Sequence, residues 1–181
     1  MRNHRPTLWA CDLLTVQTLA FETLYVLVFV GHVRRELVHL NVTASPTAAW
    51  VWRQLMEATP WGRQPRYLVR DRDTVYGRDF VQRARRVGIE TVLTPIRAPR
   101  ANAIAERLVG TLRRECLDHL VIVNEAHLRT VLTEFLRDYN AERPHRALAL
   151  QTPSPTVRPT VGLIRSHAVL GGLHHVYQRA A

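Results

Sequence analysis

Three short runs of branched and aromatic residues near the start of the chain predict three consecutive β-strands. They cover residues 8–16, 24–30 and 36–43, and the second run, LYVLVFV, is apolar throughout. Branched and aromatic side chains favour strands, and the short polar links between the runs are typical of hairpins. We therefore expect three strands joined by tight turns.

Helical and extended segments alternate after these strands. Residues 48–58 have a helical composition, and Pro46 suits the first position of that helix. Residues 67–70, YLVR, form a short run that indicates a buried strand. A basic helix over residues 78–87, ended by a glycine, and one more strand over residues 89–93 complete the alternation.

Two further helices are predicted in the second half, each preceded by an asparagine that can cap its first turn. Asn102 precedes the first helix, and Asn124 precedes the second, which extends through Tyr139. The second helix has an apolar face, made of Leu128, Val131, Leu132, Phe135 and Leu136. Three strands followed by alternating helices and strands predict an α/β fold, in which a mixed five-stranded sheet has helices on both faces.

Composition changes this picture mainly through charge. The chain has 181 residues with 46% hydrophobic content, which is enough to bury a core. Its formal net charge of +10 favours a polyanionic partner, although charge alone does not separate nucleic acid from an anionic membrane surface. All 25 basic residues are arginine, which binds phosphate through paired hydrogen bonds; a GC-rich genome accounts for the same bias equally well.

Cysteine content and hydropathy indicate the cellular compartment in which the protein is found. Cys11 and Cys116 have no metal-ligand spacing and are too few for a disulfide framework, which suits a reducing compartment. The most apolar run, residues 21–30, is too short to cross a bilayer and is interrupted by Glu22. The N-terminus carries no apolar signal core. We therefore expect a cytoplasmic protein with no membrane partner.

Acidic residues in strands and at a helix start are the candidates for chemistry. Asp12 lies inside the first apolar strand, where a buried carboxylate is costly without a partner. Asp71 and Asp73 directly follow the fourth strand, although aspartates are also ordinary turn residues at such places. Glu106 lies near the start of the helix after Asn102 and, taken alone, is equally well explained as a solvated residue. The joint order of the three positions is what indicates a site.

Several longer motifs contain these acids and follow one another along the chain. They are WACDLLTV, TLYVLVFV, LVRDRDTVYG, APRANAIAERLVGTLRRECLDHL and YNAERPHRAL, with the tail VLGGLHHVYQRAA. Together they resemble the catalytic core of DDE transposases and retroviral-type integrases, and more closely the insertion-sequence transposases of the IS481 and IS3 type. The resemblance extends over nearly the whole chain. It implies a ribonuclease H-like fold, in agreement with the expected order of elements.

The resemblance implies a catalytic triad of Asp12, Asp71 and Glu106. Related proteins have Ser-Asp-x-Gly and then an aromatic residue at the second acid, and alignment on Tyr76 selects Asp71 over Asp73. The triad is expected to bind two Mg²⁺ ions, which Mn²⁺ can replace, because Mg²⁺ prefers hard oxygen ligands. The implied reaction is DNA transposition in two stages. Water cleaves at the element's end to free a 3′-hydroxyl, and that hydroxyl then attacks target DNA.

The same resemblance implies DNA as the partner, at both the element's ends and the target, bound by a homo-oligomer. Asn102 is expected to fix the loop before the helix that carries Glu106. Cations around Glu106 are expected to contact the DNA backbone; they are Arg97, Arg100, Arg107, Arg113 and Arg114. A charged helix face is also often simply solvated, so both interpretations of these arginines stay open.

The expected domain organisation is a catalytic core over residues 1–155 followed by a C-terminal tail over residues 156–181. Family members carry a helix-turn-helix region upstream, and this sequence shows none before its first strand, which suggests a truncated protein. Two other functions therefore stay open. One is an inactive remnant that binds DNA or other subunits without catalysis, and the other is a different ribonuclease H-like nuclease acting on RNA–DNA hybrids or junctions.

Overall fold

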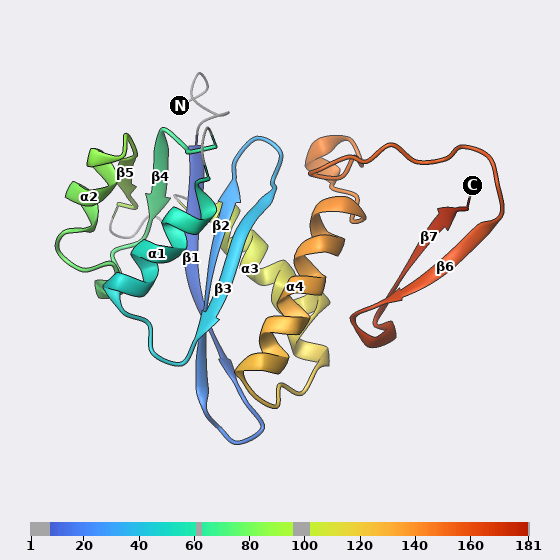
Figure 1. Ribbon diagram of the computed structural model, residues 1–181, viewed down its shortest axis with the longest axis horizontal. Coiled ribbons are helices and arrows are strands. Elements are labelled where there is room, and N and C mark those ends of the chain that lie inside the picture. The colour runs from blue at the N-terminus through green and yellow to red at the C-terminus, as the bar shows by residue number, and fades with distance from the viewer. Residues whose placement is uncertain (1–7, 61–62, 96–101, 181) are drawn as a thin grey trace.

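A five-stranded sheet forms the centre of the protein (Figure 1). The computed structural model describes residues 8–60, 63–95 and 102–180. The strands lie in the order β3-β2-β1-β4-β5; their bounds are β1 Leu8–Gln17, β2 Thr23–Gly31, β3 Leu37–Thr43, β4 Tyr67–Arg70 and β5 Glu90–Leu93. β1 pairs antiparallel with β2 and parallel with β4, so the central strand has neighbours of both kinds. The mixed five-stranded sheet predicted from the sequence is confirmed.

Helices cover both faces of this sheet, as predicted. Their bounds are α1 Ala48–Ala58, α2 Phe80–Arg86, α3 Ala103–Glu115 and α4 Glu125–Ala141. Side chains of β1 alternate between the two faces. Ala10 and Leu14 pack into a core with α3 and α4, whereas Trp9 and Cys11 pack into a second core with α1 and α2. No helix in the described ranges is both long and apolar enough to cross a membrane.

The N-terminal ends of α1 and α4 test two predictions made from the sequence, of which one is confirmed and one is wrong. Asn124 caps α4 as predicted, since its side-chain oxygen accepts the amide of His127 at 2.8 Å. The expectation that Pro46 is the first helical residue of α1 is wrong. Thr47 follows it as the cap, and its hydroxyl accepts the amide of Trp50 at 3.1 Å. The threonine satisfies an amide that would otherwise be unpaired at the helix start.

Asn140, near the C-terminal end of α4, ties that helix to the start of β3. Its Oδ1 accepts the amide of Leu37 at 2.9 Å, and its Nδ2 donates to the Leu37 carbonyl at 2.8 Å. The side chain thus bonds Leu37 as a neighbouring strand would. Close by, Arg34 donates to the carbonyls of Thr152 and Pro153 at 2.6 and 2.9 Å. These contacts hold the segment after α4 against the same end of the sheet.

The last described segment forms an antiparallel hairpin, which the sequence analysis had treated only as a tail. Its strands are β6 Ile164–Val169 and β7 His174–Arg179. The hairpin lies on the side of α4 away from the sheet (Figure 1). Leu170 at its turn is buried, and its amide donates to Oε1 of Glu134 in α4 at 2.7 Å. The division at residue 155 stays a prediction.

Replacing Asn140 with alanine removes both hydrogen bonds to Leu37. We expect the free energy of unfolding to fall by about 2 kcal/mol, because each such bond contributes about 1 kcal/mol and an unpaired partner costs more. Urea unfolding measures the change. Arg137→Ala on the exposed side of the same helix is the control, expected to stay within about 0.5 kcal/mol of the parent. If the two variants are equally stable, Asn140 does not hold α4 to the sheet.

Candidate active site

Asp12 lies in the middle of β1, on the sheet face that α3 covers. Its carboxylate is half-buried, and its Oδ1 accepts the amide of Leu13 at 2.9 Å. The pKa of Asp12 is raised to about 6, first by burial and then by the negative charges of Asp71 and Glu106, against the lowering effect of the Leu13 amide. The structure therefore brings the three predicted acids into one electrostatic neighbourhood.

The parallel pairing of β1 with β4 explains why Asp71 comes close to Asp12. Ala10 pairs with Val69 in this ladder. Continued two residues beyond the end of this ladder, the same register predicts Asp71 beside Asp12 and on the same face. Asp71 follows the last residue of β4, so its side chain is only half-buried.

Asp73 has a different set of contacts. Its Oδ1 accepts the amide of Val75 at 2.9 Å and thereby caps a short 3₁₀ turn at Thr74–Tyr76. Its own amide donates to Oδ1 of Asp71 at 3.3 Å. These contacts support Asp71 as the second acid of the candidate site and give Asp73 a role in the turn. The assignment of Asp71 itself stays a prediction.

Glu106 reaches the site from the first turn of α3. Ala105 and Leu108 on either side of it are buried against the sheet, while Glu106 is exposed. The apolar residues of α3 recur at helical spacing and pack the helix against the sheet. Glu106 lies beside them on the helix, so its carboxylate is at the edge of the packed face. Its negative charge contributes to the raised pKa of Asp12.

Two polar side chains of α3 tie the helix to the backbone of β1. Nδ2 of Asn102 donates to the carbonyl of Cys11 at 3.0 Å, next to Asp12. Two turns after Glu106, Nη2 of Arg113 donates to the carbonyl of Thr15 at 3.1 Å. The prediction that the side chain of Asn102 caps the helix is wrong, because it makes no capping hydrogen bond. The two ties lie on either side of Glu106 along the helix and fix its position relative to β1.

The remaining predicted arginines divide into two groups. Arg107 and Arg114 are exposed on α3, and Gly110 between them leaves room for the Arg114 guanidinium to lie along the helix. Arg97 and Arg100 fall outside the described residues. Arg107, next to Glu106 in the sequence, and Arg114, two turns further along α3, therefore offer positive charge on this helix, whereas Arg113 already donates a hydrogen bond to β1.

A support that the sequence analysis missed lies on the other face of the sheet. Arg70 is buried, stacks over the ring of Tyr76 at 4.4 Å and donates to the backbone carbonyl of Asp71 at 2.9 Å. Sγ of Cys11 lies 3.3 Å from the Tyr76 hydroxyl, and burial raises the pKa of this thiol to about 12. These contacts join the strands that carry Asp12 and Asp71. The sequence signal that could have revealed this support is Arg70, a charged residue at the end of an otherwise apolar strand.

The donor atoms of the candidate site suit a hard divalent cation, since carboxylate oxygens are the ligands that Mg²⁺ and Mn²⁺ prefer. Within residues 8–60, 63–95 and 102–180, no group of three or more histidine, cysteine, aspartate or glutamate side chains is gathered closely enough to hold a metal ion. Repulsion among like charges opposes such a gathering, and a cation would relieve it. The residue types and their electrostatics therefore fit a metal, although the ligand set is not preformed.

Comparison with known proteins identifies similar sequences. Residues 87–153 match the model of the integrase core domain family. The chain is 31% identical over 121 residues to an uncharacterized 39.2 kDa protein of insertion element IS476 from Xanthomonas euvesicatoria, covering 66% of this chain and 35% of that protein. It is 32% identical over 77 residues to transposase InsD for insertion element IS2D from Escherichia coli, covering 42% and 26%. The chain thus spans well under half the length of these relatives.

Solved structures show the same fold at low sequence identity. An intasome of simian T-cell lymphotropic virus, in complex with a PP2A regulatory subunit, matches with a TM-score of 0.69 at 15% identity, over 97% of this chain and 67% of that chain. The HTLV-2 integrase catalytic core in complex with magnesium matches with a TM-score of 0.65 at 12% identity, over 82% and 94%. The predicted ribonuclease H-like fold is confirmed.

Asp12→Asn should stabilise the protein at neutral pH, because the folded state has to ionise a carboxyl whose pKa is raised from 3.8 to about 6. The folded state binds this proton more tightly than the unfolded chain, so stability falls as pH rises from about 4 to about 6. Asparagine keeps the acceptor for Leu13 without the charge. We expect a gain on the order of 1–2 kcal/mol at pH 7.5 that vanishes near pH 4, measured by urea unfolding. An equal difference at both pH values would contradict the raised pKa.

Asn102→Ala should lower the pKa of Asp12. Without the bond to Cys11 the start of α3 is released, and the charge of Glu106 moves away from Asp12. Asn124→Ala, which removes a cap remote from the site, is the control: it should cost about 1 kcal/mol of stability and leave the pKa of Asp12 unchanged. Carboxyl ¹³C NMR titration of Asp12 measures both. Identical titration curves in the two variants would show that Asn102 does not position Glu106.

Proposed function

Because residues 87–153 match the integrase core domain family and the chain has the fold of integrase cores, we propose that it is a DDE-type transposase/integrase core that cleaves DNA phosphodiester bonds and joins the freed strand to target DNA. The observation that supports this proposal is the half-buried Asp12 in β1, whose pKa is raised by burial and by the negative charges of Asp71, after β4, and Glu106, in α3. The helix that carries Glu106 also carries the exposed Arg107 and Arg114. Carboxylates can bind metal cations, and arginines can bind phosphates. This combination suits cleavage of a DNA backbone.

Asp12, Asp71 and Glu106 are the residues that would hold the divalent ions, Mg²⁺ or Mn²⁺ in its place. Two such ions, when bound, stabilise the attacking and leaving oxygens of a phosphodiester. The chain itself contributes placement: the β1–β4 register sets the aspartates, and the ties of α3 set the glutamate. The magnesium complex of the similarly folded HTLV-2 integrase core supports the use of a divalent metal. We propose the reaction in two stages, with water and then the freed 3′-hydroxyl as the attacking group.

DNA is the partner we propose, bound mainly through its phosphates. Arg107 and Arg114 are placed for this role on α3, with Arg113 in addition to its bond to Thr15, and we keep Arg97 and Arg100 as proposed contacts. The net charge of +10 supports a polyanion. Such binding releases counterions, so its affinity should fall steeply with salt.

Assembly and compartment are also part of the proposal. The similarly folded neighbours include an intasome and trimeric and dimeric forms of the HTLV-2 integrase core, which supports a homo-oligomer on DNA. Cys11 and Cys116 are both buried free thiols, which suits the reducing cytoplasm.

The test is nicking of supercoiled plasmid, followed by strand transfer to it, with Mg²⁺ or Mn²⁺ and short duplexes that end in a 3′-hydroxyl. We expect Asp12→Asn, Asp71→Asn and Glu106→Gln each to lower the rate by roughly a hundredfold or more. Asp73→Asn is the matched control: it changes a neighbouring aspartate in the turn and should stay within about threefold of the parent. A loss with Asp73→Asn and none with Asp71→Asn would reverse the assignment of the second acid.

Two other outcomes would replace the proposal. If Mg²⁺ raises the melting temperature of neither the parent nor the Asp12→Asn variant while DNA still binds, the chain is a binding remnant without catalysis. If an RNA–DNA hybrid or a junction is cut and no strand is transferred, the chain is another ribonuclease H-like nuclease.

A further inference from the structure

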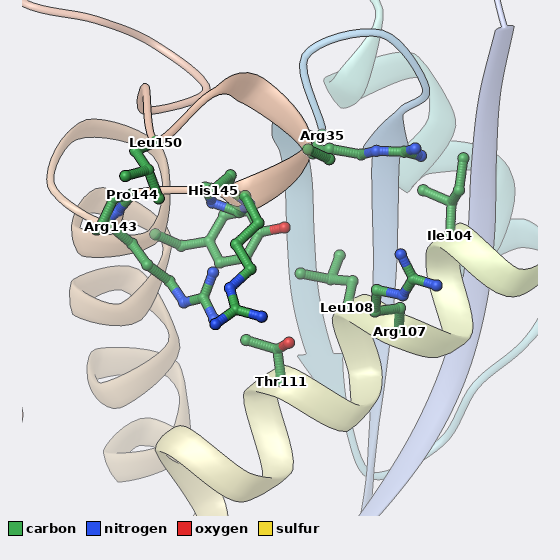
Figure 2. Close-up of a pocket in the computed structure, with 12 residues that line it drawn as sticks. Arg35, Ile104, Arg107, Leu108, Thr111, Arg143, Pro144, His145 and Leu150 are labelled. Carbon is green, nitrogen blue, oxygen red and sulfur yellow. The ribbon is translucent and has the colours of Figure 1, made fainter.

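A cavity of about 490 Å³ lies between α3 and the segment that follows α4. Figure 2 shows Arg107, Leu108 and Thr111 entering it from α3, with Pro144 and His145 on the opposite side. The opposite wall is part of the sequence motif YNAERPHRAL, for which the proposed chemistry has no use. The volume of the cavity lies within the range of small-ligand sites, about 300–1,000 Å³.

Four arginines line this cavity, from three separate parts of the chain; they are Arg35, Arg107, Arg143 and Arg146. The described residues that line it include no acidic side chain. Outside the lining, Glu115 accepts two hydrogen bonds from Arg143 and so offsets one of the charges. The walls therefore keep an excess of positive charge, which repels itself until an anion enters.

His145 adds a polar group that lacks a partner. Its side chain is only 8% exposed, and its Nε2 is buried with no hydrogen-bond partner among the described residues. The Tyr139 backbone carbonyl bonds to the ring, and the Tyr139 ring meets it edge to face at 4.7 Å between centroids. These contacts hold the ring of His145 in the wall of the cavity, with its Nε2 buried. A buried polar atom of this kind costs free energy unless a ligand or water bonds to it.

The chemistry of these walls selects the class of ligand. Guanidinium groups bind phosphate oxygens in pairs, and a histidine that becomes protonated can donate a further hydrogen bond to the same group. Ile104, Leu108 and Leu150 add apolar surface beside the charges, which suits a sugar attached to the phosphate. Arg107 directly follows Glu106 in α3, so the cavity opens one helix face away from the candidate active site.

We propose that this cavity binds a backbone phosphate of the DNA strand that runs through the candidate active site. The proposal rests on the proposed function, and it gives the YNAERPHRAL motif a second task besides the bond of Asn140 to Leu37. The cavity acts as an anchor beside the reacting phosphodiester. It sets the register of the strand without reading bases, because phosphate contacts carry no direct sequence information.

Two substitutions and a control test the anchor on the full chain. Arg146→Ala removes an exposed charge from the cavity wall, and His145→Phe keeps the ring packing while removing Nε2. Arg86→Ala removes an equally exposed charge from α2, on the opposite side of the sheet. Thermal unfolding confirms that all three remain folded, and Arg146→Lys tests whether charge alone restores binding.

Binding is measured by fluorescence anisotropy on a short duplex over a range of salt. We expect Arg146→Ala to weaken DNA binding about tenfold and to reduce the salt slope by about one. Arg86→Ala should change the affinity by less than about twofold. Equal effects of the two alanine variants would show only a general loss of charge and would overturn the anchor.

An NMR titration of the His145 ring reports directly on binding in the cavity. Its ring resonances are assigned by their disappearance in His145→Phe, and the pKa of its imidazole, lowered in the free protein by burial and by Arg143, should rise when duplex DNA binds. Inorganic phosphate should give a weaker shift that the duplex displaces. A phosphate shift that DNA does not displace would indicate a small phosphate ligand and overturn DNA as the source. A shift only with poly-glutamate would indicate an acidic protein partner, and no shift with any probe would exclude an anion site.

The two proposals fail in different ways. If Asp12→Asn shows the same loss of nicking as expected but DNA leaves the resonances of His145 unchanged, the proposed function survives and the anchor does not. If DNA shifts His145 and the parent protein neither nicks nor transfers DNA with either metal, the cavity binds phosphate and the proposed function is wrong.

Discussion

The position of one carboxyl in the central strand is the constraint on which the rest of the site depends. Asp12 lies in β1 between residues that pack into the cores, so burial by itself already opposes its ionisation. The parallel strand β4 brings a second acid beside it, and α3 brings a third. Each addition makes ionisation harder, because like charges raise one another's pKa. The fold therefore holds an arrangement that is electrostatically unfavourable by itself and that a cation would favour.

Holding that arrangement requires rigid contacts outside the acids themselves. Asn102 and Arg113 bond the backbone of β1 at Cys11 and Thr15, and the apolar face of α3 is buried on the same strand. On the other face of the sheet, Arg70 bonds the backbone at Asp71. Hydrogen bonds to backbone carbonyls suit this task because they fix elements without changing the charge of the carboxylates. The repulsion at the site is thus balanced by packing and tethers on both faces.

Much of this could be predicted from sequence because it depends on local pattern. Strand β1, the asparagine cap of α4 and the placement of acids after strands all follow from residues close together in the chain. The role of Asn102 could not, because its partner is the carbonyl of Cys11, far away in sequence and identical to any other carbonyl. The same holds for Asn140, whose two bonds to Leu37 imitate a strand that the sequence does not contain. Side chains that bond a distant backbone leave no signal in spacing or composition.

Helix α3 connects the site and the cavity because its faces have different partners. One face carries Glu106 and is tied to β1, and the adjacent face carries Arg107 and Thr111 at the cavity wall. A rotation or shift of α3 would therefore change the distance from Glu106 to Asp12 and the spacing of the cavity walls together. The segment after α4 is in turn held to the sheet through Asn140, so the far wall of the cavity is fixed to the same frame as β1. With both walls fixed to one sheet, a group bound in the cavity lies at a set position relative to the three acids.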